Sequence, residues 1–178
     1  MSTWMIVEDE PSIYDMLMAM FQMWGIDGAA FVNGEEAMAW IEDVDALRFK
    51  GELPELALID VRLPGALQGP AIGARLRRSP RLKDIAIVIT SAYLLSVEEE
   101  QAAIREADAD AYVRKPLPRL NEFKLILEKT LAERRARLPL PEAQPAAGTP
   151  ETALPRKAPV KPRRPARRPA AKPKPRSK

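Results

Sequence analysis

Acidic side chains follow two of the short apolar runs in this chain. Glu8 and Asp9 follow the run 5–7, and Asp60 follows the run 56–59. Short apolar runs bounded by turn signals are typical of buried strands, and open α/β folds bind ligands where the carboxyl ends of parallel strands meet. Clustered carboxylates repel one another unless protons or a cation neutralise them. The pattern therefore predicts a site for a small divalent cation such as Mg2+, with an anionic ligand beside it.

Further candidate groups fall at the ends of two other apolar runs. Ser91 and Ala92 come after the run 85–89, and Lys115 comes after the short run 111–113. If these runs are strands of the same parallel sheet, their ends lie at the same edge as the acidic residues. A lysine beside three carboxylates suits a cation that bridges the protein to a phosphoryl group. Ala92 is small, which leaves room for an incoming donor.

The chemistry predicted for this set is phosphoryl transfer to an aspartate. Asp60 would be the nucleophile. Mg2+ held by Asp9 and Asp60, with Glu8 acting through water, would neutralise charge on the phosphoryl oxygens. Lys115 would supply a point cation to another oxygen, and the Ser91 hydroxyl would supply a hydrogen bond.

Strand and helix patterns alternate along the first 137 residues. The expected strands are 5–7, 26–32, 56–60, 85–89 and 111–113, and the expected helices are 11–24, 33–48, 70–78, 96–107 and 120–137. This alternation predicts a parallel sheet covered on both faces. Right-handed crossovers favour a flavodoxin-like, doubly wound (βα)5 sheet with strand order 2-1-3-4-5.

Four motifs give the chain its resemblance to the receiver domain of two-component response regulators. They are Val7–Glu10, Leu58–Gly65, Ile89–Ala92 and Tyr112–Pro116. Each motif alone is weak, but the four together at suitable separations are strong. The resemblance covers about residues 3–135.

The resemblance implies a phosphoacceptor and its metal. Asp60 would accept a phosphoryl group from a sensor histidine kinase or a histidine phosphotransfer protein. Mg2+ would be bound by Glu8, Asp9, Asp60 and the backbone carbonyl of Arg62. Such a protein is a phosphorylation switch with at most slow self-dephosphorylation rather than an enzyme. Its output, with no dedicated output domain, would come from an unidentified partner docking on the fourth helix, fifth strand and fifth helix.

The resemblance also implies a conformational switch. Its members would be Ser91, whose hydroxyl turns toward the phosphoryl group, and Tyr112, whose ring turns inward. Thr90 is the other candidate for the switch hydroxyl, and we choose Ser91 from its place in the motif. The Lys115–Pro116 peptide bond is expected to be cis, which proline permits at low cost.

Some positions depart from the family pattern. Asp108 stands where the family often has glycine, so it must adopt a left-handed turn. The stretch 42–54 is longer than usual.

Arg62 stands two residues after the nucleophile, where aspartate-nucleophile phosphohydrolases place a general acid–base. A phosphohydrolase on a similar sheet is the alternative function, and the arginine counts against it.

Composition changes sharply near residue 138. Residues 138–178 hold 11 Lys or Arg and two acidic residues, a net charge of +9, whereas residues 1–137 have a net charge of −6. The segment also has 11 of the 18 prolines and no aromatic residue, so it cannot bury enough apolar surface to fold. We expect a receiver domain at 1–137 and a disordered tail at 138–178.

The basic stretch 155–178 has three interpretations. It is a solubilising tail, a nonspecific contact to nucleic acid or another polyanion, or a segment attracted to the acidic domain of its own chain. The second interpretation makes the chain a nucleic-acid-associated protein, which is a further alternative function.

The chain lacks two reactive residue types, a run long enough to span a membrane and a secretory signal pattern, and these absences restrict its chemistry and its location. The chain has no cysteine and no histidine, which excludes disulfides, thiolate chemistry and a histidine base or metal ligand. The longest nearly apolar run, 16–24, is too short to span a bilayer, and the start lacks the pattern of a secretory signal. We therefore expect a cytoplasmic protein.

Methionines are frequent in the first predicted helix. Helical spacing assigns Met20 to the core with Met16 and Met23 flanking it, and it leaves Met18 on the exposed face. An exposed methionine there is expected to contact a helical phosphodonor, because methionine surfaces adapt to their partners.

Overall fold

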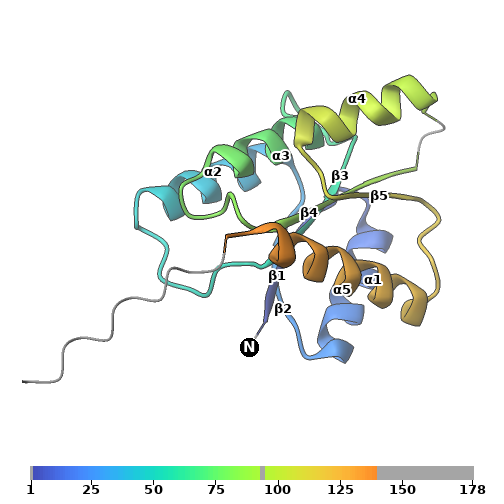
Figure 1. The fold of residues 1–178 in the computed structure, drawn as a ribbon, viewed down its shortest axis with the longest axis horizontal. Coiled ribbons are helices and arrows are strands. Elements are labelled where there is room, and N and C mark those ends of the chain that lie inside the picture. The colour runs from blue at the N-terminus through green and yellow to red at the C-terminus, as the bar shows by residue number, and fades with distance from the viewer. Residues whose placement is uncertain (1, 93–94, 140–178) are drawn as a thin grey trace, which may run out of the picture. The chain divides into compact units, whose positions relative to one another are not determined.

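The computed structural model describes residues 2–92 and 95–139 (Figure 1). The predictions for 140–178, including the basic stretch 155–178, lie outside the described residues. Five parallel strands form one sheet in the order β2-β1-β3-β4-β5, which confirms the predicted flavodoxin-like topology. The strands are β1 Thr3–Val7, β2 Asp27–Phe31, β3 Leu56–Asp60, β4 Ala86–Ser91 and β5 Ala111–Arg114. The helices are α1 Pro11–Trp24, α2 Gly34–Asp45, α3 Gly69–Arg78, α4 Val97–Ala107 and α5 Leu120–Arg137.

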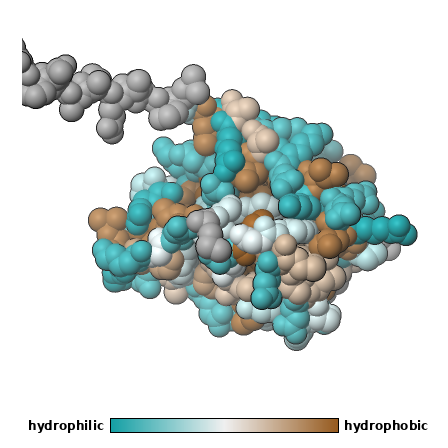
Figure 2. Space-filling view, turned by 90° about the horizontal axis from the view of Figure 1, so that it is seen from below, coloured by the Kyte–Doolittle hydropathy of each residue, from teal (hydrophilic) through white to brown (hydrophobic). Residues whose placement is uncertain are grey.

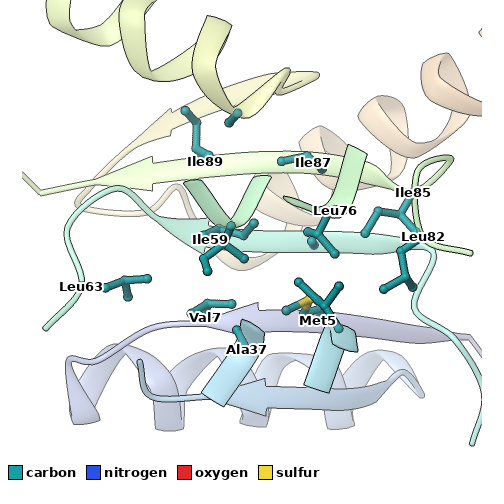
Figure 3. Packing of buried hydrophobic residues seen from close by; sticks show 14 of the residues in the cluster. Met5, Val7, Ala37, Ile59, Leu63, Leu76, Leu82, Ile85, Ile87 and Ile89 are labelled. Atoms are coloured by element: carbon teal, nitrogen blue, oxygen red, sulfur yellow. The ribbon is translucent and has the colours of Figure 1, made fainter. Parts of the chain in front are cut away.

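Helices cover both faces of the sheet. Helices α2, α3 and α4 lie on one face, and α1 and α5 lie on the other (Figure 1). Side chains alternate along the strands accordingly. Met5, Ile59 and Ile87 belong to the core under α2–α4 (Figure 3), whereas Ile6 and Leu58 belong to the core under α1 and α5. Because β1 and β3 are buried at every residue, the sheet is a fixed platform from which the polar strand ends project.

Local signals set several helix ends where the sequence predicts them. The Asn33 side chain accepts a hydrogen bond of 2.8 Å from the backbone of Glu36 and caps α2. Ser96 and Glu99 form a capping box at the start of α4, which satisfies two backbone donors reciprocally. Gly25 ends α1 in the left-handed conformation, with φ of 70°.

Helix α2 is shorter than the sequence suggests. The predicted helix 33–48 ends at Asp45, and Leu47 has a φ of 60°. A left-handed residue cannot continue a right-handed helix, so the chain turns here into the long connection that precedes β3. The second strand is also shorter than the predicted range 26–32.

The predicted burial of Met20 in α1 is confirmed, whereas the predictions for the other three methionines of this helix are wrong. Met18 is half-buried because β2 has a glycine beneath it: a Cβ atom at Gly28 would lie 2.9 Å from the Met18 sulfur. Met16 and Met23 are exposed at 38% and 64% instead of flanking the core. Helical spacing alone could not reveal this, because the space above Gly28 comes from a different element.

On the face of the molecule that Figure 2 shows, hydrophilic and hydrophobic residues are interspersed. Among the described residues, no helix combines the length and the apolar character that crossing a membrane requires.

Candidate functional site

The strand register brings the predicted acidic residues to one edge of the sheet. Val7 of β1 pairs with Ile59 of β3, so Glu8 and Asp60 follow paired residues on adjacent strands. Asp60 in turn pairs with Thr90 of β4. The acidic residues are therefore neighbours because parallel strands end together, although they lie far apart in the sequence.

Three carboxylates converge at this edge. Glu8, Asp9 and Asp60 each offer an oxygen, and these oxygens lie within 4.8 Å of one another. Glu8 and Asp60 are buried, at 2% and 6% exposure, while Asp9 is exposed. The three residues line a hollow of about 340 Å³, to which Ala92 and Lys115 also contribute. The site is thus anchored in the interior and open to solvent on one side.

Lys115 lies between the two buried carboxylates. Its Nζ donates hydrogen bonds of 2.9 and 2.7 Å to the two carboxylate oxygens of Glu8 and lies 3.0 Å from Oδ1 of Asp60. The sequence predicts Lys115 beside the three carboxylates, but it does not predict the two-oxygen contact with Glu8. Glu8 therefore positions the lysine directly.

Burial and charge change the protonation equilibria of this trio. Burial raises the pKa of the Glu8 carboxyl above its ordinary value, although Lys115 opposes the rise. Burial also raises the pKa of the Asp60 carboxyl, again against the pull of Lys115. Burial alone would lower the pKa of Lys115, but its contacts with Glu8 and Asp60 outweigh that effect and raise it. The carboxylates thus lack sufficient positive charge around them, while the lysine stays protonated.

The donor set fits a hard divalent cation. Mg2+ prefers oxygen ligands at about 2.0–2.1 Å, so its ligand atoms lie up to about 4.2 Å apart, close to the 4.8 Å spread of the three carboxylates. Glu8, Asp9 and Asp60 could hold the ion from the open side. One lysine does not neutralise three carboxylates, and a divalent cation would correct that imbalance.

The loop after β3 is held by residues that the motif analysis did not identify. Gly69 begins α3 directly against the Asp60 carbonyl: a Cβ atom there would lie 1.9 Å from that oxygen. Gln68 accepts a hydrogen bond from the Leu63 backbone N–H and donates one to its carbonyl. Glycine at 69 therefore lets α3 approach the end of β3. That requirement is not visible locally in the sequence.

Glu35 of α2 also supports this loop from a distance. Its carboxylate accepts hydrogen bonds from the backbone N–H groups of Ala66 and Leu67, at 2.9 and 3.3 Å. These contacts lower the pKa of Glu35. No sequence signal connects Glu35 with this loop, which lies more than 30 positions away, so only the tertiary structure reveals this contact.

The proposed switch residues share one face of the sheet. Ser91 follows the alternation of Ile87 and Ile89 toward α2–α4, and Tyr112 packs against that same core. Thr90 pairs with Val113, which belongs to the opposite core. Both Thr90 and Ser91 are buried. The alternation therefore separates Thr90 from Tyr112 and keeps Ser91 with it.

The end of β5 completes the edge. The Lys115 backbone N–H donates to the Ser91 carbonyl at 2.8 Å, and the Lys115–Pro116 peptide bond is cis. Arg62 is exposed and lines the hollow. The role of its backbone carbonyl as the fourth metal ligand stays a prediction.

Comparison with known proteins agrees with this geometry. Residues 4–127 match the model of the response regulator receiver domain family. An uncharacterized 14.6 kDa protein of the sodA1 3′ region of Leptolyngbya boryana is 29% identical over 128 residues, covering 72% of this chain and 89% of that protein. The transcriptional regulatory protein AruR of Pseudomonas aeruginosa is 31% identical over 151 residues, covering 84% of this chain and 55% of AruR. This chain therefore spans only about half the length of AruR.

A solved structure shares the fold at lower identity. The receiver domain of the sensor histidine kinase PA1611 from Pseudomonas aeruginosa PAO1 was solved with a magnesium ion coordinated in its active site cleft. It is 21% identical, has a TM-score of 0.60, and covers 74% of this chain and 98% of that domain.

Proposed function

Because the chain belongs to the response regulator receiver domain family, we propose that it is a phosphoacceptor switch whose acceptor is Asp60. The observation that carries this proposal is the arrangement around that carboxylate. Asp60 is buried at the floor of an open hollow, 3.0 Å from the Lys115 ammonium and beside two further carboxylates. A nucleophile, a metal-binding set and a fixed cation are the parts that phosphoryl transfer requires.

Each residue has a role in the transfer. An Asp60 oxygen attacks the phosphorus of a phosphohistidine donor; the new O–P bond forms while the P–N bond breaks, and the imidazole nitrogen recovers a proton from solvent. Glu8, Asp9, Asp60 and the Arg62 carbonyl would hold Mg2+, which would supply positive charge for the phosphoryl oxygens. Lys115 turns from the Asp60 carboxylate to a phosphoryl oxygen while Glu8 retains it.

Phosphorylation is read out by Ser91 and Tyr112. The Ser91 hydroxyl turns toward the phosphoryl group, and the Tyr112 ring follows on the same face of the sheet. The Tyr112 hydroxyl is buried without a hydrogen-bond partner among the described residues. An unsatisfied buried hydroxyl costs free energy. Only a small additional free-energy difference is therefore needed to move the Tyr112 ring out of this position.

The partners follow from the family and from the surface. A sensor histidine kinase or a histidine phosphotransfer protein supplies the phosphoryl group. On α1, which begins beside the site, the exposed Met16 and Met23 replace Met18 as the adaptable contacts for such a donor. Output passes to a protein that recognises α4, β5 and α5 once Tyr112 has moved.

Phosphorylation in vitro tests the proposal. We expect incubation with acetyl phosphate and Mg2+ to add one phosphoryl group, about 80 Da by intact mass, and chelation of the metal to prevent it. Asp60→Ala should give no adduct, whereas the matched variant Asp84→Ala, at an exposed loop aspartate, should be modified like the wild type. An equal adduct in Asp60→Ala would refute the assignment.

A further inference from the structure

The backbone between β3 and α3 has to hold the Arg62 carbonyl, the fourth ligand of the proposed metal site. Residues 61–68 form this loop and have neither helix nor strand conformation. Close to Arg62 the loop is anchored: the Val61 backbone N–H donates to the Thr90 carbonyl at 2.8 Å, and Leu63 is buried in the core under α2–α4. The position of the Arg62 carbonyl therefore depends on how the rest of the loop is held.

The middle of this loop lies on the surface and needs support from outside. Pro64, Gly65 and Ala66 are exposed, so burial does not fix them. Gly65 has a φ of 91°, a conformation that glycine adopts without strain. Successive backbone N–H groups in a turn form a concave donor site for an anionic oxygen. The loop therefore offers donors that a carboxylate can bind.

The Glu35 carboxylate of α2 occupies this donor site. Its Oε1 atom accepts hydrogen bonds from the backbone N–H groups of Ala66 and Leu67, at 2.9 and 3.3 Å. The carboxylate also lies directly against Gly65, because a Cβ atom there would be 2.6 Å from Oε1. The hydrogen bond from Ala66 is the largest cause of the lowered pKa of Glu35, so the acceptor stays ionised at neutral pH. One side chain thus contacts three consecutive residues of the loop.

Helix α2 holds this carboxylate in a fixed place. Gly34, its first residue, packs so closely on the loop that a Cβ atom would lie 2.4 Å from the Leu67 carbonyl oxygen. The Asn33 side chain caps the same end of the helix. The start of α2 and the loop are therefore in direct backbone contact, and a loop that shifts relative to α2 must break the Glu35 hydrogen bonds.

We propose that Glu35 is a positioning residue for Mg2+ binding, an inference that rests on the proposed function. Its carboxylate keeps the loop in the conformation that presents the Arg62 carbonyl to the ion, and it touches neither the ion nor the phosphoryl group. When only a fraction of the molecules has the binding-competent loop, the apparent affinity falls by that fraction. The coupling is reciprocal, so bound Mg2+ strengthens the Glu35 contact in turn.

Mg2+ titration of the full-length chain tests the role of the Glu35 acceptor. The amide signals of Asp9 and Lys115, followed by NMR without a phosphodonor, give the Kd. We expect Glu35→Ala, which loses both hydrogen bonds, to weaken Mg2+ binding about three- to tenfold. Glu35→Gln retains an acceptor oxygen and should stay within about twofold of the wild type. The matched control Glu36→Ala removes the same charge at the exposed neighbouring position and should also stay within about twofold.

Amide exchange with water reports on the contact itself. In the metal-free protein, the N–H groups of Ala66 and Leu67 should exchange more slowly in the wild type than in Glu35→Ala. Saturating Mg2+ should slow them further in the wild type, by a factor of the same order as the change in Kd. The amides of β1 and β3 should exchange equally in both proteins, which shows that the variant keeps the fold.

Three results would overturn this inference and leave the phosphoacceptor proposal intact. One is an unchanged Kd in Glu35→Ala when the wild type binds Mg2+ at the three carboxylates. The second is equal weakening in Glu35→Ala, Glu35→Gln and Glu36→Ala, because the loss of negative charge alone would then explain it. The third is an exchange rate of Ala66 and Leu67 that Mg2+ does not change. A wild type that binds no Mg2+ at this edge would instead contradict the proposed function, and this inference with it.

Discussion

Two clusters of charged side chains differ in how their charges are balanced. One lies at the carboxyl ends of the parallel strands, and the other lies toward their amino ends. At the site, Lys115 faces Glu8 and Asp60, with Asp9 beside them. At the other cluster, Asp110 of the β4–β5 region is met by Arg77 at 2.7 Å, with Arg134 and Arg137 at 3.6 Å. The first cluster has an excess of acid, and the second has an excess of base.

The two clusters also differ in what their polar groups contact. Arg77 donates to the carbonyls of Lys83, Ile85 and Asp108, and Asp110 accepts from the Ile87 backbone N–H at 2.9 Å. The arginine cluster therefore completes its hydrogen bonds with its own backbone. The acidic cluster leaves carboxylate oxygens directed at an open hollow. A charged cluster whose groups form hydrogen bonds within the protein is structural. A cluster whose negative charge is not compensated by the protein is a site for a ligand.

Removing the central arginine should have the largest effect on stability. Arg77→Leu removes the side-chain donor to the Ile85 and Asp108 carbonyls and to Asp110, while the Lys83 carbonyl retains Arg134. We therefore expect the free energy of unfolding to fall by about 3 kcal/mol. Urea denaturation measures the change. Arg78→Leu, at the exposed neighbour on the same helix, should change it by less than about 0.5 kcal/mol. Equal effects would mean that the arginine cluster is not a structural element.

Magnesium should stabilise the protein through the acidic cluster. A ligand that binds only the folded state at 100 times its Kd adds about 2.7 kcal/mol, so thermal unfolding should shift upward with Mg2+ and return after chelation. Asp9→Asn should reduce the shift strongly, and sodium chloride at equal ionic strength should not reproduce it. A shift of the same size in Asp9→Asn would place the ion elsewhere.

Neutralising the acceptor should stabilise the metal-free fold slightly. Burial raises the pKa of Asp60 in the folded state, so ionisation disfavours folding above that raised pKa and has no such cost below the unfolded value of about 4. We therefore expect Asp60→Asn to gain about 1 kcal/mol at pH 7. The gain should disappear as the pH falls below 4. Destabilisation at pH 7 would show that Lys115 already compensates this carboxylate.

An effect of similar size to that of Asp60→Asn is expected at the turn that ends α4. Asp108 has a φ of 47° and a ψ of 49°, and this left-handed conformation disfavours most side chains. Asp108→Ala should lose about 1 kcal/mol, while Asp108→Gly should stay within about 0.5 kcal/mol of the wild type. If both variants lose equally, the exposed contact between the Asp108 carboxylate and Arg77 matters more than the backbone conformation.

The sequence allowed prediction of features that depend on position along a strand. Asp60 and Lys115 could be identified as site residues because each lies at the carboxyl end of a strand, and parallel strands end together. The contact between Lys115 and Glu8 could not, because it depends on how deeply each side chain is buried. The support from Glu35 and the burial of Met18 also escaped prediction, since each requires a partner from a distant element. The periodicity of residues describes a single helix or strand, whereas a tertiary contact joins two such elements.

Mapping the phosphoryl group tests the central claim most directly. After reaction with acetyl phosphate and Mg2+, borohydride reduces an aspartyl phosphate to homoserine, and peptide sequencing by mass spectrometry locates that residue. We predict homoserine at position 60 alone, only when both Mg2+ and the phosphodonor are present. Homoserine at position 9 or elsewhere, or none in a protein that has gained the phosphoryl mass, would contradict Asp60 as the acceptor.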